Sequence, residues 1–221
     1  MAIPQLWDER GFTLMELLVA SVVTMLVLGG AVALTSQIQG GYRRQLEDSA
    51  GEQEARYALE WIGRYLRGAG NNPFSVTKSD CPGANTDFFG VIIDPNGDGV
   101  NNDITLQMDS NPPDGKVGGE SPDCDQANEH VTISFDEDTN TIEFLDEAVG
   151  ASATTRTDNV IENLQFTYMM NDRVTEVTDQ DDAPNIAYVR VVITIRTRTI
   201  NAASGLPDTR ALESMVRVRD R

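Results

Sequence analysis

Apolar residues near the N-terminus follow two patterns. From Phe12 to Leu34 the chain is almost continuously apolar, and Glu16 is its only charged residue. At ~1.5 Å of helical rise per residue, this stretch is long enough to cross the ~30 Å hydrocarbon core of a bilayer. Further on, apolar residues recur at helical spacing and form a stripe along one face. The stripe comprises Ala58, Trp61, Ile62, Tyr65, Leu66 and Ala69.

The two patterns predict one long helix from Phe12 to Ala69. Its first part, residues 12–34, is apolar all round, whereas its continuation over residues 35–70 has one face to bury. Charged residues of alternating sign recur every fourth position along the exposed face of the continuation. Pairs of glycines at 29–30 and 40–41 are expected weak points of this helix. The charged positions are Glu52, Arg56, Glu60 and Arg64.

The remainder of the chain, residues 71–221, predicts a globular head rich in β-strands. The clearest strand covers residues 187–195, where apolar side chains alternate with mostly polar ones. A long helix followed by consecutive strands implies an α+β fold with an antiparallel sheet. The other expected strands cover residues 88–93, 164–170 and 212–218, together with a hairpin of 131–135 and 142–144 around the turn 136–140.

The charge of the chain limits its partners. The formal net charge is −18 and the isoelectric point is about 4.2, so phosphate backbones would be repelled. This argues against nucleic acid as a partner. A solvated acidic surface of an exported protein is the simplest interpretation of the excess, although such a surface can also bind cations.

The apolar N-terminal segment allows three interpretations. It could be a leader followed by a retained helix, a secretory signal cleaved after the small residues 31–33, or a plain membrane anchor. A secretory signal fits poorly, because the segment is long and carries Glu16 within it. A carboxylate in an apolar span is costly in lipid, and only the first interpretation gives it a purpose.

The residues Arg10-Gly11-Phe12-Thr13-Leu14-Met15-Glu16 resemble the processing site of type IV prepilins. The resemblance implies that residues 1–11 are a leader, that prepilin peptidase cuts between Gly11 and Phe12, and that the new Phe12 amine is methylated. It further implies that Glu16 neutralises the Phe12 amine of a neighbouring pilin during assembly. The protein would be a single-pass inner-membrane protein with a periplasmic head that later enters a pilus or pseudopilus.

Four further segments resemble PilW-type minor pilins. The resemblance covers the end of the helical stem, one strand in the middle of the head and the last strands, but not the loops between about 71 and 128. It implies the type IV pilin-like fold, in which the long helix packs on the antiparallel sheet. The segments are residues 55–60 with 64–70, 161–168, 189–198 and 214–219.

A loop from Asp94 to Asp103 begins like a calcium-binding loop. Oxygen-bearing side chains at alternate positions converge on calcium when a glycine permits a sharp turn. The pattern lacks the glutamate of an EF-hand, since Thr105 stands at its twelfth position, and the same residues also favour a simple turn. No cofactor is required, and calcium is the one suggested. Its ligands would be Asp94, Asn96, Asp98 and Asp103 with the carbonyl of Val100.

Two cysteines, Cys81 and Cys124, lie in loops rich in Pro, Gly and Asp. If the head is exported, a disulfide between them is expected, whereas in a reducing compartment both would be free thiols. The single histidine, His130, gives no familiar nucleophile–base pair, so the sequence does not predict an enzyme.

The function expected from the sequence is therefore structural. It is that of a minor pilin that assembles by helix packing and head contacts. A minor pseudopilin of a type II secretion system would share the same stem and head. An exported, calcium-dependent adhesion module cleaved after Ala33 is the alternative of another class.

Overall fold

The long helix is present. The computed structural model describes residues 12–77, 87–110, 113–117, 127–147, 152–200 and 205–218. Helix α1 runs from Leu14 to Gly68, which confirms the predicted helix with its start shifted by two residues and its end by one. The helix continues through both glycine pairs without interruption. The chain divides into two compact units, Met1–Leu46 and Glu47–Arg221, and each is described here separately.

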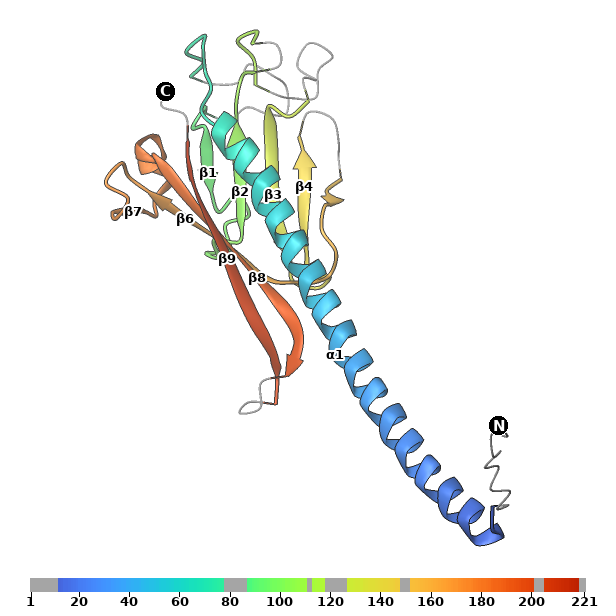
Figure 1. Cartoon of the computed structure of the whole chain (residues 1–221). Coiled ribbons are helices and arrows are strands. Elements are labelled where there is room, and N and C mark those ends of the chain that lie inside the picture. The colour runs from blue at the N-terminus through green and yellow to red at the C-terminus, as the bar shows by residue number, and fades with distance from the viewer. Residues whose placement is uncertain are drawn as a thin grey trace, which may run out of the picture. The chain divides into compact units, whose positions relative to one another are not determined.

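The described residues of the second unit form nine strands, which pair in two antiparallel sheets (Figure 1). The first sheet has the order β1-β2-β3-β4-β5, so its strands are neighbours in both sequence and space. The predicted hairpin of residues 131–144 is confirmed as β3 and β4. The bounds are Val91–Ile93 for β1, Asp103–Gln107 for β2, His130–Asp136 for β3, Thr141–Asp146 for β4 and Thr154–Thr155 for β5.

The second sheet has the order β7-β6-β8-β9. Its inner strand β8 contains all but the first residue of the alternating segment 187–195, and the apolar side chains of that segment are buried as predicted. A short 3-10 helix, η1 (Gln180–Asn185), precedes β8. The bounds are Ile161–Met169 for β6, Glu176–Val177 for β7, Tyr188–Ile200 for β8 and Pro207–Arg217 for β9.

The predicted apolar stripe of α1 is buried in one core with both sheets. Ile62 and Leu66 are fully buried, and Tyr65 is the only one of the six stripe residues that is partly rather than fully buried. On the side of the first sheet, Trp61 meets Phe144 of β4 edge to face, with ring centroids 6.1 Å apart. The helix therefore forms a third layer over the head.

Small residues on α1 allow the second sheet to approach closely. A Cβ added to Gly63 would lie 3.5 Å from Val216 of β9, and one added to Gly51 would lie 3.7 Å from Ile195 of β8. The helix ends where Gly70 adopts a positive φ of 78° and donates its N–H to the carbonyl of Gln107 in β2. These contacts fix residues 51–70 against both sheets.

Candidate functional site

The start of α1 is built around Glu16. The Glu16 N–H donates to the hydroxyl of Thr13 at 3.2 Å, and the Thr13 N–H donates to the Glu16 carboxylate at 3.4 Å. This reciprocal pair is a capping box, which satisfies two N–H groups that the first helical turn leaves open. Sequence reasoning missed this second role of Glu16, although the spacing Thr-x-x-Glu is its signature.

The apolar side chains of the first unit are exposed. Phe12 is 83% exposed and Leu14 is 84% exposed, and the large apolar residues that follow as far as Leu46 stay at least half-exposed, apart from Val22 at 49%. One helix among the described residues, α1, is long and apolar enough to cross a membrane, and its most apolar window lies near the N-terminus. A surface of this size needs a lipid or protein environment.

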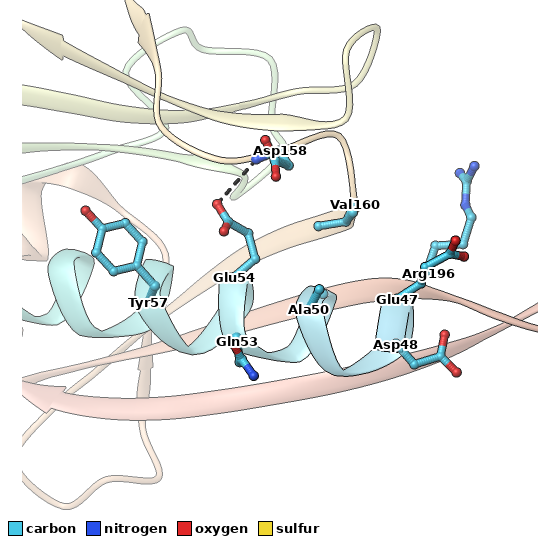
Figure 2. Close-up of a pocket in the computed structure, with 10 residues that line it drawn as sticks. Glu47, Asp48, Ala50, Gln53, Glu54, Tyr57, Asp158, Val160 and Arg196 are labelled. Carbon is cyan, nitrogen blue, oxygen red and sulfur yellow. Dashed lines mark hydrogen bonds between the residues drawn. The ribbon is translucent and has the colours of Figure 1, made fainter. Parts of the chain in front are cut away.

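A groove lies where the second unit begins on α1 (Figure 2). The described polar residues that line it are mainly acidic, and Arg196 of β8 is the one cation among them. Glu54 accepts a hydrogen bond from the N–H of Asp158 at 3.3 Å, and Arg196 forms an ion pair with Glu162 at 2.6 Å. The groove is lined by Glu47, Asp48, Ala50, Gly51, Gln53, Glu54, Tyr57, Asp158, Val160 and Arg196. Among the described residues of this lining there is no serine, cysteine or histidine that could act as a nucleophile or base.

The predicted calcium residues form a tight loop between β1 and β2. Asp94 has a positive φ of 45°, and its carboxylate accepts hydrogen bonds from the N–H groups of Gly97, Asp98 and Gly99. The Asp98 carboxylate accepts from the N–H of Val100 at 2.7 Å. The loop backbone thus folds tightly around these acidic side chains, and the glycines at 97 and 99 permit this conformation.

Asp103 closes the loop from the first residue of β2. It is only 3% exposed, and one of its oxygens, Oδ2, accepts from the Asn96 N–H at 3.3 Å. Its other oxygen, Oδ1, is buried without a hydrogen-bond partner. Burial raises the pKa of Asp103 to about 6. The Asn96 N–H opposes this rise, while the charges of Asp94 and Asp98 add to it.

The cleavage site, the cysteine pair and the single histidine are the remaining candidates from the sequence. Gly11, Cys81 and Cys124 lie outside the described residues, so the cleavage site and the disulfide stay predictions. His130 is buried in β3, and its Nδ1 has no hydrogen-bond partner. Burial lowers the pKa of His130, although the nearby carboxylates of Glu147 and Asp146 counteract this. These surroundings favour a neutral, structural histidine.

The comparisons with known proteins bear on the first unit. Residues 8–32 match the family model for the prokaryotic N-terminal methylation motif. No curated protein and no solved structure matches the chain.

The motif and the fold together define a class. The methylation motif supports a type IV prepilin-like protein, and the long helix followed by antiparallel sheets is consistent with type IV pilin-like architecture. The apolar helix near the N-terminus fits a membrane-anchored pilin. A role of the pilin or pseudopilin type follows from these observations.

Proposed function

We propose that the protein is a PilW-type minor pilin that takes part in the assembly or initiation of a type IV pilus. The methylation motif over residues 8–32, placed on an exposed apolar helix, is the observation that carries the proposal. Prepilin peptidase would cut after Gly11 and methylate Phe12. The inner membrane would hold the helix, with the head in the periplasm, until other pilins replace the lipid around it.

In this proposal Glu16 has two tasks. Its carboxylate caps α1 through Thr13, and in the filament it neutralises the Phe12 amine of a neighbouring subunit. A capped carboxylate retains acceptor positions, because an ionised carboxyl group offers about four of them. A buried ion pair of this kind is tolerable where either lone charge is not.

Three variants of Glu16 separate the two tasks. Gln can replace Glu in a capping box but carries no charge, whereas Ala loses both cap and charge. We expect Glu16→Gln and Glu16→Ala to be processed like the parent yet to enter pili at least about tenfold less, as measured by immunoblotting of sheared filaments. Glu16→Asp, which keeps the charge on a shorter side chain, should retain part of the incorporation.

The matched control is Glu137→Gln, which removes the same charge from the exposed β3–β4 turn and should incorporate normally. Normal incorporation of Glu16→Gln together with failure of Glu16→Ala would assign Glu16 to capping alone and refute the pairing role.

A minor pseudopilin of a type II secretion system is the second candidate, because the same helix and motif would serve it. Deletion of the gene separates the two. Loss of surface pili with normal protein secretion supports the pilus assignment, and loss of secretion with normal pili contradicts it.

Export of the head would also place Cys81 and Cys124 in an oxidising compartment, where we propose that they form a disulfide. Peptide mapping without reduction should recover the two cysteines in one linked pair, and two alkylatable thiols would contradict this.

A further inference from the structure

The hydrogen bonds of the β1–β2 loop do not use all of its carboxylate oxygens, since Asp103 Oδ1 has no partner. We propose that this loop binds one calcium ion between Asp94, Asp98 and the buried carboxylate of Asp103. This site is independent of the pilin assignment, because all of its residues lie in the head.

The loop supplies the oxygen donors that calcium selects. Calcium takes six to eight oxygen ligands from carboxylates, amides, carbonyls and water. Asp94, Asn96 and Asp98 offer side-chain oxygens at alternate positions, and Val100 offers a carbonyl two residues further on. Asp94 and Asp98 already accept backbone N–H bonds at the loop interior, and each keeps acceptor capacity for a metal.

Asp103 provides the independent observation. Asp103 is only 3% exposed, its Oδ2 faces the loop through the bond from the Asn96 N–H, and its Oδ1 is buried without a hydrogen-bond partner. A buried, unpartnered carboxylate oxygen is costly in a folded protein, and a cation is the partner that would offset this cost. Asp103 stands two residues before the EF-hand glutamate position, so the loop would be a shortened variant.

Calcium binding would require some side chains and hydrogen bonds of this loop to rearrange. Among the described residues, no three side chains of His, Cys, Asp or Glu are already gathered as a metal-binding set. The ion would therefore draw Asp98 and Asp103 toward Asp94, and Asn96 would turn its carbonyl from the Asp98 N–H to the metal. A site that must close in this way is expected to bind weakly, with Kd of about 10⁻⁴ M.

The position of the loop gives the ion a structural role. The Asn102 carbonyl accepts from the N–H of Phe135 in β3, and the Asn101 carbonyl accepts from the N–H of Phe166 in β6. The Tyr168 hydroxyl of β6 donates to the backbone carbonyl of Asp103 at 3.3 Å. The loop therefore touches both sheets, and calcium would clamp them together at this point.

The test is calcium titration of the full chain in detergent micelles, by calorimetry and by thermal unfolding, with magnesium as the competing ion. We expect one calcium per chain and a raised unfolding midpoint. Asp98→Asn should weaken binding about tenfold or more. The control is Asp138→Asn, which removes the same charge from the exposed β3–β4 turn and should bind calcium like the parent.

The variant Asp103→Asn tests whether a loss of calcium binding could be due to misfolding. Because it removes a buried charge that has one oxygen without a hydrogen-bond partner, its unfolding midpoint without calcium should equal or exceed that of the parent, while its gain on adding calcium should disappear. Absence of saturable binding by the parent up to several millimolar calcium would overturn the proposal. Equal losses in Asp98→Asn and Asp138→Asn would overturn it too, since they would indicate diffuse attraction to an acidic surface.

Discussion

The two units of the chain differ in the exposure of their apolar side chains. In the first unit Leu17 is 66% exposed and Leu18 is 52% exposed, whereas in the second unit Ile62 and Leu66 are fully buried. All four belong to the same helix, α1 (Figure 1). Membership of one helix therefore does not decide burial; what differs is whether the chain itself supplies residues that cover the apolar side chains. The head builds its own core, while residues 12–46 depend on an environment outside the unit.

We expect the greatest loss of stability when a buried leucine of α1 is truncated. Leu66→Ala removes side-chain volume from the core beneath both sheets, so we expect the free energy of unfolding of the head to fall by about 2–5 kcal/mol. Leu17→Ala should change it by less than ~0.5 kcal/mol, because no core surrounds that side chain. Urea denaturation of the full chain in detergent, followed by tryptophan fluorescence, measures both. Equal losses would show that the two parts of α1 are not different.

A smaller effect is expected from the aromatic contact between α1 and the first sheet. The Tyr65 hydroxyl donates to the side-chain carbonyl of Asn128 at 2.6 Å, and its ring lies 5.1 Å from that of Phe144. Tyr65→Phe keeps the ring and loses the hydrogen bond, which should cost about 0.5–1.5 kcal/mol. Tyr42→Phe, on the exposed part of α1, is the matched control and should leave stability unchanged. The same denaturation assay detects the difference.

The pH dependence of the head should carry a signature of His130. Since burial lowers its folded pKa below the usual value near 6.5, the unfolded chain binds more protons in that range. Stability from this group is therefore fully present above pH 6.5 and is lost as the pH falls through the lowered pKa. As the single histidine of the chain, His130 gives one imidazole resonance by NMR, and its midpoint should lie below 6.5. A midpoint above 6.5 would contradict a buried neutral ring.

His130→Gln isolates this contribution. Asp103 titrates with a raised pKa of about 6, so the native head gains a proton there as the pH falls and the two groups oppose each other. The parent should lose more stability than His130→Gln between pH 7.5 and 5.5. An identical loss would show that His130 plays no part in acid destabilisation.

The most local effect that we expect concerns the cap of α1. Thr13→Val removes the hydroxyl that accepts from the Glu16 N–H and should cost about 1 kcal/mol, confined to the first turn. Amide hydrogen exchange in micelles should show faster exchange near Glu16 and unchanged exchange in the head. Unchanged exchange at Glu16 would show that the capping box is not formed.

Most of the fold could be predicted from the spacing of apolar residues along the chain. The stripe on α1 and the alternation in β8 identify their buried faces, because burial on one side leaves a clear period in the sequence. Strand β2 was missed, since all five of its residues are buried and Asp103, Thr105 and Gln107 conceal a strand among polar side chains. The division of the strands into two sheets was also not predicted, because pairing depends on contacts distant in sequence.

The candidate sites divide in the same way. Glu16 stands out in the sequence because a lone charge in an apolar segment is visible without a structure. The burial of Asp103 is not visible there, because it depends on where β2 joins the sheet and on Tyr168 of β6. The contact of Asp103 with Tyr168, which is distant in sequence, thus makes this acidic turn a candidate metal site.

The mass of the N-terminal peptide of the mature protein decides whether the chain is processed as a prepilin. The protein would be purified from a bacterium with an active prepilin peptidase and digested, and its first peptide would be sequenced by mass spectrometry. The account predicts a peptide that begins at Phe12 with one methyl group on its amine, which leaves the apolar helix intact for packing. A chain that begins at Leu34, or that keeps residues 1–11, would contradict it.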